Sequence, residues 1–209
     1  MVSYPVTRYL YRPVSTRAAR ALERTPVTPG HVTLVSALLS TGGAVAFGYR
    51  SYWLGAILSL LGIITDCIDG DLSRLTGRSS TVGAFLDSVM DRWTDAAMIV
   101  GLAIANPAHW TVAGVALTAS LLTSYTRARA QSLGVDCPDG IGGRDTRVLL
   151  LVIAAPAGLI ELGLWAVAVT GVVTALHRML VATRRRRALE AGKVPAAPDQ
   201  ASVALSRKP

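Results

Sequence analysis

Residues 66–74 read Asp-Cys-Ile-Asp-Gly-Asp-Leu-Ser-Arg, and this stretch places three carboxylates inside a segment that is apolar enough to cross a membrane. The next apolar segment carries three more carboxylates, at Asp87, Asp91 and Asp95. A carboxylate near the centre of a bilayer costs at least about 2.5 to 3.5 kcal/mol on insertion scales. We therefore expect the cluster to hold cations or to move protons.

The spacing of these acids predicts two facing helical surfaces. Asp66 and Asp69 are three residues apart, and the later acids follow one another at intervals of four. Residues at these intervals share one face of a helix. The intervening residues 76–80, Thr-Gly-Arg-Ser-Ser, are typical of a turn. The pattern therefore predicts two antiparallel helices whose acidic faces meet near a short loop.

Two glycines and the type of ligand indicate what such a pocket would hold. Gly70 and Gly83 are expected on its two inner walls, where a missing side chain lets a backbone or a ligand approach closely. Carboxylate oxygens are hard ligands, which favour Mg²⁺ or Mn²⁺ over Zn²⁺. Cys67 is too isolated to indicate zinc. The alternative, in which Arg74 and Arg92 merely pair with the acids, leaves most of six carboxylates unneutralised.

The order of these residues resembles the motif of the CDP-alcohol phosphotransferase family, D-x2-D-G-x2-A-R-x8-G-x3-D-x3-D. The chain matches it from Asp66 to Asp91 at every fixed position except Ser73, which stands where the family usually has alanine. This change of one small residue for another removes no carboxylate and no arginine. The resemblance implies transfer of a phosphate-linked group from a CDP-alcohol, expected to be CDP-diacylglycerol, to a hydroxyl group, with release of CMP.

The resemblance also implies roles for individual residues. Four positions match the family's metal-binding carboxylates, so Mg²⁺ or Mn²⁺, expected as two ions, would be held by Asp66, Asp69, Asp87 and Asp91. Asp91 also matches the general base, which would accept the proton of the acceptor hydroxyl. Two cations that bridge a diphosphate neutralise developing charge and orient the attacking group.

The expected donor site combines the motif with a second segment. Residues that match the family's CDP-alcohol-binding positions, or lie beside them on the pocket wall, are Gly70, Arg74, Ser80 and Gly83. Residues 28–32, Thr-Pro-Gly-His-Val, resemble the family's Pro-Asn segment before the first span, although glycine replaces the usual asparagine. We therefore expect the nucleotide to be lined by Pro29, Gly30, His31 and Val32.

Basic residues near the ends of later helices indicate the acceptor. Arg144 and Arg147 share a helical face at a predicted helix start, where the N-terminal partial charge favours an anion. The pattern resembles the phosphatidylinositol phosphate synthase branch, whose basic positions are matched by Arg127, Arg144, Arg147 and Arg178. This predicts a phosphorylated polyol acceptor, an inositol phosphate. Three departures from the branch pattern are Arg127 for lysine, Gln131 for glutamate and Gly143 for glutamate.

Two other functions remain open. Phosphatidylglycerol phosphate synthases share the same core and use glycerol 3-phosphate. A membrane ion or proton transporter also carries intramembrane acids, but it predicts internal repeats and charges spread along a path. The two halves of this chain show no such repeat, and the acids gather near one membrane face.

Two acids of the cluster are assigned lesser roles. Asp71 occupies a variable position of the motif and is expected to be a solvated charge. Asp95 lies one turn beyond Asp91 and is expected either to support Arg92 or a neighbouring helix or to contact the ligand directly.

The hydropathy pattern predicts an all-α integral membrane protein with six spans. In a chain of 209 residues with 51% hydrophobic residues, apolar stretches fall at 31–49, 52–73, 82–105, 108–128, 147–162 and 164–182. The fifth is the shortest and contains Pro156. We expect a cytoplasmic amphipathic arm at 1–30 with a surface helix over 4–24, a catalytic domain at 31–183 and a basic, disordered tail at 184–209.

The distribution of Lys and Arg predicts the orientation. Basic residues concentrate in the N-terminal arm, the loops at 74–80 and 127–147, and the tail, whereas the opposite loops carry only Arg50. This asymmetry predicts a multi-pass protein of the cytoplasmic membrane with its active site facing the cytoplasm. It also explains the net charge of +8 without nucleic acid as a partner. Small residues such as those at 113–119 favour a homodimer.

Overall fold

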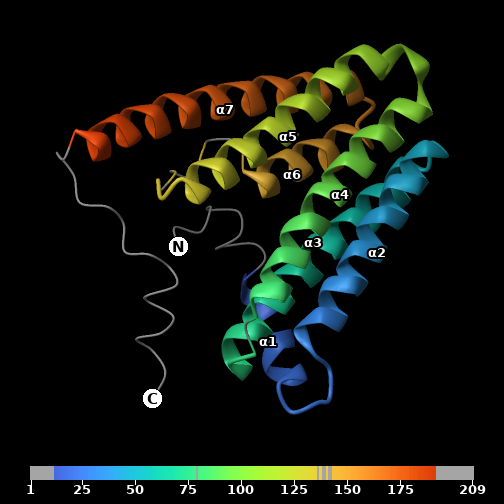
Figure 1. The fold of residues 1–209 in the computed structure, drawn as a ribbon. Helices are drawn as coiled ribbons and strands as arrows, with labels where there is room; N and C mark the ends of the chain where they lie inside the picture. Colours follow the sequence, from blue (N-terminus) through green and yellow to red (C-terminus); the bar gives the residue numbers. More distant parts are fainter. Residues whose placement is uncertain (1–11, 79, 136, 138–139, 141–142, 192–209) are drawn as a thin grey trace.

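The structure is a computed structural model that describes residues 12–78, 80–135, 137, 140 and 143–191. Within these residues it is helical throughout and contains no strand (Figure 1), which confirms the predicted all-α class. In chain order the helices are α1 (Arg12–Leu22), α2 (Pro29–Gly48), α3 (Tyr52–Thr76), α4 (Thr81–Ala105), the 3-10 helix η2 (Pro107–His109), α5 (Trp110–Ser132), α6 (Arg144–Ala154) and α7 (Ile160–Glu190).

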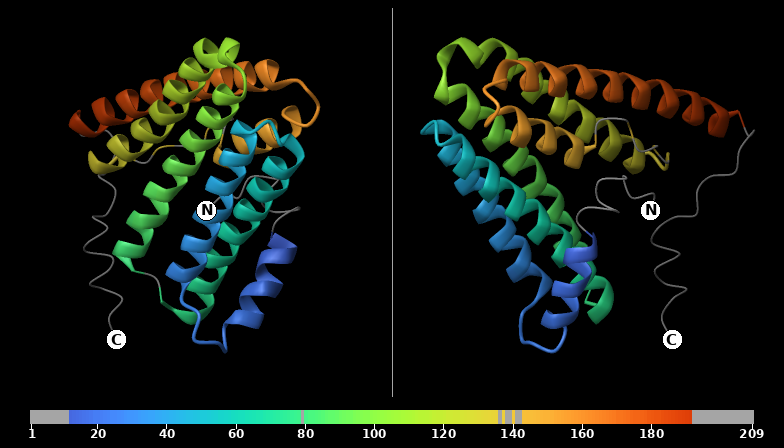
Figure 2. Two further views of the ribbon diagram at one scale, coloured as in Figure 1. Left: turned by 90° about the vertical axis from the view of Figure 1, so that its right-hand side faces the viewer. Right: turned by 180° about the vertical axis from the view of Figure 1, so that it is seen from behind.

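The long helices form two groups that converge at one end and diverge at the other. Helices α2, α3 and α4 lie side by side, and α5, α6 and α7 form the second group (Figures 1 and 2). Contacts of α3 with α6 and of α4 with α5 join the groups. The groups meet where α2 turns into α3 and α4 into α5. The start of α6 therefore lies toward the open end, as do the last turns of α3 and the first turns of α4.

In the described part of the chain three helices, α2, α3 and α7, are long and apolar enough to cross a membrane, judged by length and composition. Helix α4 is as long as α3 but carries Asp91, Arg92 and Asp95 near its middle. Helix α6, with 11 residues, is shorter than the roughly 20 residues that a bilayer requires. These apolar helices indicate a membrane protein. The arrangement of six spans stays a prediction.

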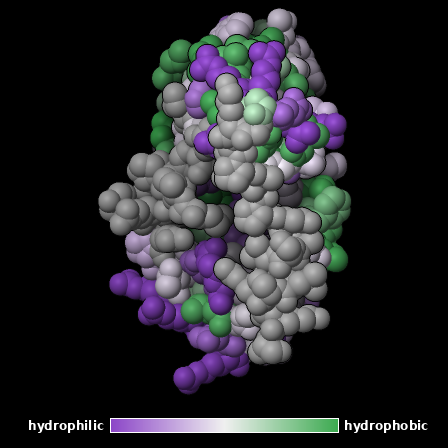
Figure 3. Space-filling view, turned by 60° about the vertical axis from the view of Figure 1, so that its left-hand side comes forward, coloured by the Kyte–Doolittle hydropathy of each residue, from purple (hydrophilic) through white to green (hydrophobic). Residues whose placement is uncertain are grey.

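The surface is rich in large apolar side chains. Many lie on the outer faces of the long helices, among them Leu38, Trp53, Ile57, Phe85, Trp93 and Leu162. On the face shown in Figure 3, hydrophilic residues gather toward the lower end, and the upper end mixes hydrophilic with hydrophobic residues. Extensive exposed apolar surface of this kind is unusual in a soluble monomer and suits a protein surrounded by lipid.

Small residues bring α2 close to both of its neighbours. A side chain at Gly62 of α3 would collide with the hydroxyl group of Ser40, and one at Gly101 of α4 would collide with the carbonyl group of Ala44. Phe47 and Leu102 are fully buried beside these contacts. Close approach of this kind increases van der Waals contact between apolar helices. It makes α2 the central support of the two helices that carry the acids.

The turn between the acidic helices forms as the sequence predicts. Gly77 ends α3 with a φ of 64°, in the left-handed region that favours glycine. Ser80 then caps α4, because its hydroxyl group accepts a hydrogen bond from the Gly83 amide at 2.9 Å.

The last two helices differ from the predicted boundaries. Helix α6 begins at Arg144 and ends at Ala154, rather than running from 147 to 162. Pro156 has no N–H group to continue it, and Gly158 adopts a φ of 74° in the turn that follows. Helix α7 continues past the predicted end at 182, through the arginine run, to Glu190. The predicted disordered tail therefore begins too early, since residues 184–190 are helical; residues 192–209 lie outside the described residues.

The N-terminal arm is described only from residue 12. Residues 12–22 form α1, which packs against α3, and Ala19 is buried with Val32 and Leu72. The remainder of the predicted helix over 4–24 lies partly outside the described residues, and its position on a membrane surface stays a prediction.

Candidate functional site

Three of the predicted metal ligands converge. Asp66 and Asp69 of α3 and Asp87 of α4 each offer a carboxylate oxygen, and these oxygens lie within 4.8 Å of one another. Asp69 is buried, and the other two are half-buried. A set of carboxylate oxygens without sulfur or imidazole suits a hard divalent cation such as Mg²⁺ or Mn²⁺. The residues present therefore fit the predicted metal.

Hydroxyl groups of α2 orient two of these carboxylates. Thr33 donates a hydrogen bond of 2.6 Å to Asp69. The single hydroxyl proton of Ser36 faces both the Gly62 carbonyl group, at 3.1 Å, and Asp66, at 3.4 Å. Hydrogen bonds to ligating carboxylates fix their orientation. Sequence reasoning missed both residues. Their spacing of three places both hydroxyl groups on one face of α2, but α2 also carries Ser40 and Thr41, so the spacing alone does not single them out.

Asp91 faces an arginine from the second helix group. Its carboxylate lies 2.7 Å from Nη1 of Arg144, and the same nitrogen lies 2.7 Å from Asp66. Thr94 adds a hydrogen bond, accepting from Nη2 of Arg144 at 3.2 Å. Asp91 is thus close to the converging acids but is paired with Arg144, and its role as metal ligand and base stays a prediction.

Asp95 anchors the start of α6. Its carboxylate accepts a hydrogen bond from Nη2 of Arg147 at 2.8 Å and lies 3.5 Å from Nε of Arg144. The side chain of Arg147 is only 5% exposed. Of the two roles considered for Asp95, the structure shows the supporting one, directed to α6 and not to Arg92.

The other predicted acceptor residues lie on α5 and α7. Arg178 is buried, and its Nη1 donates a hydrogen bond of 2.7 Å to the carbonyl group of Thr123 on α5. It also lines a groove of about 560 Å³ between α5 and α7, together with Arg129 and Arg187. Arg127 is half-buried on α5. The structure thus gathers Arg144 and Arg147 at the acids and holds Arg178 between α5 and α7.

The predicted donor residues lie around the α3–α4 turn. Arg74 pairs with Asp71 at 2.5 Å and is 56% exposed. A side chain added at Gly70 would contact only the guanidinium group of Arg74, at 3.7 Å, and one at Gly83 would meet only the hydroxyl group of Ser80, at 3.0 Å. The glycines were expected to admit either a neighbouring backbone or a ligand. Among the described residues no neighbouring backbone approaches either glycine within 4 Å, so the space suits a ligand.

The predicted nucleotide segment forms the first turn of α2. Thr28 and His31 make a capping box, in which each side chain accepts a hydrogen bond from the other residue's backbone amide. Pro29 opens the helix, Gly30 is exposed, and Val32 is buried. The segment therefore has a structural function as a helix cap, and its contact with a nucleotide stays a prediction.

The expectation for Asp71 was wrong. Its carboxylate is buried, and it accepts hydrogen bonds from Ser15 at 2.7 Å, from Thr16 at 3.1 Å and from Arg74 at 2.5 Å. Two of these donors belong to α1, whose packing against α3 could not be inferred from the motif. Asp71 fastens α1 to the helix that carries the metal ligands.

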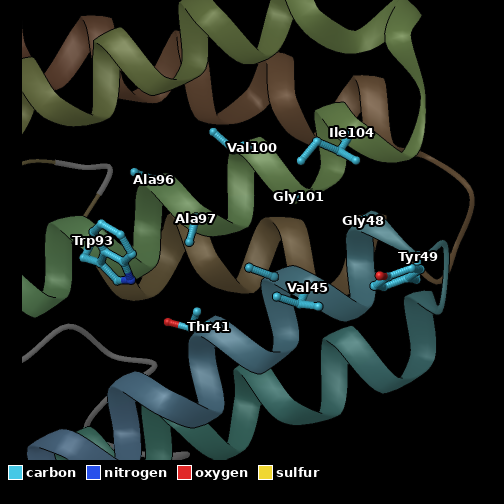
Figure 4. A pocket seen from close by; sticks show the side chains of 11 residues that line it. Thr41, Val45, Gly48, Tyr49, Trp93, Ala96, Ala97, Val100, Gly101 and Ile104 are labelled. Atoms are coloured by element: carbon cyan, nitrogen blue, oxygen red, sulfur yellow. The ribbon is translucent and has the colours of Figure 1, made fainter.

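An apolar cavity of about 670 Å³ lies between α2 and α4. Figure 4 shows Trp93 at one end and Tyr49 with Ile104 at the other, with Thr41 and Val45 along the α2 side. Trp93 lies two positions after Asp91, so it is at a similar level along α4 but on another face of the helix. The cavity therefore begins level with Asp91 and runs along α4 away from the acids.

Comparison with known proteins identifies a family. A sequence model of the family described as CDP-alcohol phosphatidyltransferase matches residues 26–196. The phosphatidylinositol phosphate synthase of Cutibacterium acnes is 36% identical over 80% of this chain and 90% of its own length. The archaetidylinositol phosphate synthase of Pyrococcus horikoshii is 31% identical over 81% of this chain and 90% of its own length.

Solved structures agree with this result. The fold is similar to phosphatidylinositol phosphate synthase of Mycobacterium tuberculosis with CDP-DAG bound, with a TM-score of 0.74, 26% identity and coverage of 81% of this chain and 94% of that one. A structure of the same enzyme in complex with manganese and citrate gives a TM-score of 0.75 at 26% identity, covering 81% of this chain and 89% of that one.

Proposed function

The chain belongs to the CDP-alcohol phosphatidyltransferase family, and we propose that it transfers the phosphatidyl group of CDP-diacylglycerol to a hydroxyl group of an inositol phosphate and releases CMP. The observation that carries this proposal is the meeting of the acids of α3 and α4 with two arginines at the start of α6. The relatives named phosphatidylinositol phosphate synthase, and the similar structure with CDP-DAG bound, support the same donor and acceptor.

The metal site would use the four predicted carboxylates. Asp66, Asp69 and Asp87 already converge, and Asp91 would join them from the next turn of α4. We propose two Mg²⁺ or Mn²⁺ ions, a choice supported by the oxygen-only ligand set and by the similar structure with manganese. When bound, the ions neutralise the diphosphate and favour departure of CMP.

Asp91 would act as the base. It would accept the proton of the acceptor hydroxyl group as that oxygen attacks the β-phosphorus, and it would later release the proton to solvent. A carboxylate beside cations is a weak base, so Asp91 must act mainly through its position. Its side chain is 24% exposed, which leaves a path for the proton to water.

The acceptor phosphate would bind at the start of α6. Arg144 and Arg147 lie in its first turn, where guanidinium groups and free backbone amides favour an anion. We propose that Arg127 and Arg178 extend this basic surface from α5 and α7. A phosphate held there would place the polyol hydroxyl group toward Asp91.

The donor would extend in two directions from the metals. Its cytidine and diphosphate would contact Gly70, Arg74, Ser80 and Gly83, with the first turn of α2 alongside. Its acyl chains need an apolar path, and the cavity between α2 and α4 offers one that begins level with Asp91 along α4. This position lets the lipid stay in the bilayer while the diphosphate reaches the acids.

The same proposal includes the orientation in the membrane. We propose that α2 to α7 form six spans, the fifth completed by the turn that follows the short helix α6, with the acids toward the cytoplasm, where the arginine-rich segments would also lie. Helix α1 would rest at that surface, fastened to α3 through Asp71. The predicted homodimer stays a prediction.

The test is a CMP-release assay on the full chain in detergent, with CDP-diacylglycerol and Mg²⁺ or Mn²⁺. Inositol 1-phosphate, glycerol 3-phosphate, serine and free inositol are supplied in separate reactions. We expect release with inositol 1-phosphate well above that with the others. Faster release with glycerol 3-phosphate would contradict the acceptor, and metal-independent release would contradict the metal site.

A further inference from the structure

Arg144 occupies a position that the predicted metal also requires. A single nitrogen, Nη1, lies 2.7 Å from Asp66 and 2.7 Å from Asp91. The two carboxylates come from different helices, and Arg144 comes from a third. Its side chain is 15% exposed, so solvent screens these contacts only partly.

The contacts have a clear electrostatic cause. Carboxylates brought together within the bundle repel one another unless a positive charge lies between them. Arginine cannot lose its proton in a protein, so Arg144 supplies that charge permanently. A divalent cation held by Asp66 and Asp91 would supply positive charge to the same two carboxylates. The guanidinium group and the cation therefore compete.

We propose that Arg144 exchanges partners during binding: it neutralises Asp66 and Asp91 before the metal binds, and the metal displaces it toward the acceptor phosphate. This inference rests on the proposed function, because it assigns the acids to a metal and Arg144 to a phosphate. It adds a coupling between the two sites. Metal binding makes the phosphate site competent, and phosphate binding frees the metal site.

The neighbouring contacts show how Arg144 would move without disturbing α6. Arg147 is buried and paired with Asp95 at 2.8 Å, which fixes the first turn of the helix. Asp95 also lies 3.5 Å from Nε of Arg144, near the base of the guanidinium group. Rotation about the outer bonds of Arg144 can therefore withdraw its Nη atoms while Asp95 stays in place. Asp95 is a positioning residue for this exchange.

Linkage makes the proposal measurable. If the metal raises the affinity for the acceptor phosphate by some factor, the acceptor must raise the affinity for the metal by the same factor. Couplings of this kind are typically about 5- to 150-fold. Both affinities are equilibrium quantities and need no turnover.

The experiment measures Mn²⁺ affinity of the purified full chain in detergent, by titration calorimetry or by the EPR signal of free Mn²⁺. Each protein is titrated with and without inositol 1-phosphate, in the absence of donor. We expect the wild type to bind Mn²⁺ roughly tenfold more tightly when the phosphate is present. Arg144→Ala should bind Mn²⁺ more tightly than the wild type without phosphate, and it should lose most of the coupling.

Two variants control for charge and for folding. Arg78→Ala removes an exposed positive charge from the α3–α4 turn and should leave both the Mn²⁺ affinity and the coupling unchanged. Arg144→Gln keeps a side chain that can bond to Thr94 and should behave like Arg144→Ala. The effect of inositol 1-phosphate on the Mn²⁺ affinity of the wild type is measured without any substitution, so a variant that fails to fold does not affect it.

The outcomes separate two failures. Equal Mn²⁺ affinity in the wild type and in a folded Arg144→Gln variant, or no coupling in the wild type, would overturn the exchange while leaving the metal site intact. If the wild type binds no Mn²⁺ at all, the proposed function fails together with the exchange.

Discussion

The pair α3–α4 and the short helix α6 meet at the same site but are held in different ways. The pair carries its acids on long helices that pack closely against α2, where the hydroxyl group of Thr33 holds Asp69 and that of Ser36 lies beside Asp66. Helix α6 has 11 residues, and ion pairs to Asp91 and Asp95 attach its first turn. The later turns of α6 are packed in the core through residues such as Val148 and Leu151. Packing thus fixes the metal ligands before any ligand arrives, whereas ion pairs hold the first turn of α6, whose arginines can therefore respond to binding.

The largest effect is expected on the packed side. Asp69→Asn removes one charge from the converging carboxylates while keeping the shape of the side chain. We expect CMP release to fall by at least about 10³-fold, because the variant weakens the charge stabilisation that the metal supplies. Glu161→Gln, an exposed change at the far end of the bundle, is the matched control. Retention of activity in Asp69→Asn would show that the acids of α3 and α4 are not the metal ligands of the reaction.

The second prediction tests the attachment of α6. Arg147→Ala leaves the Asp95 carboxylate at a largely buried position without its main partner. Loss of one member of a buried pair costs about 3 kcal/mol. We expect the free energy of unfolding to fall by this amount in a denaturant titration. A change as small as that of the exposed control Arg129→Ala would show that packing, and not charge, holds α6.

Arg144 should separate binding of the acceptor from binding of the donor. Arg144→Ala removes a cation from the proposed phosphate site but leaves the donor residues of α3 and α4 in place. We expect the KM for inositol 1-phosphate to rise by about 10- to 100-fold, equivalent to about 1.4 to 2.7 kcal/mol, with a much smaller change for CDP-diacylglycerol. Equal changes in both KM values would argue against an acceptor site at α6.

The smallest effect concerns the support from α2. Thr33→Val keeps the shape of the side chain but removes the hydroxyl group that donates to Asp69. Loss of such a hydrogen bond typically lowers metal affinity by about tenfold or somewhat more. A Mn²⁺ titration measures this, and Thr33→Ser should restore the affinity. If the serine variant binds as weakly as the valine variant, the hydroxyl group does not orient Asp69.

The acids of α3 and α4 could be placed from the sequence because intervals of three and four leave them on one face of each helix, with a recognisable turn at Gly77 between them. The role of Thr33 could not, since Thr33 is one of several hydroxyl-bearing residues of α2 and only tertiary packing selects the one that meets Asp69. The partner of Arg144 is far away in the chain, and no local pattern indicates which carboxylate it meets. Asp71 was misjudged because two of its three donors belong to α1, whose docking depends on tertiary packing.

The boundaries of α6 and α7 also include one feature that the local sequence indicates and one that hydropathy misses. Pro156 and Gly158 are local signals, and they end α6 where backbone geometry requires. The extension of α7 to Glu190 reflects the high helix propensity of arginine, alanine and leucine, supported by the pair Arg186–Glu190 at 2.9 Å. Hydropathy alone predicts an end at residue 182, because it measures how well a segment suits lipid and not its tendency to form a helix.

The most direct test of the central claim is detection of phosphatidylinositol phosphate by mass spectrometry after incubation of the full chain with CDP-diacylglycerol, inositol 1-phosphate and Mn²⁺. We expect the phosphorylated lipid and CMP to form in equal amounts, to disappear on chelation of the metal, and to be absent in Asp91→Asn. Formation of the lipid by Asp91→Asn at the wild-type rate, or CMP release by the wild type without the lipid product, would contradict the account.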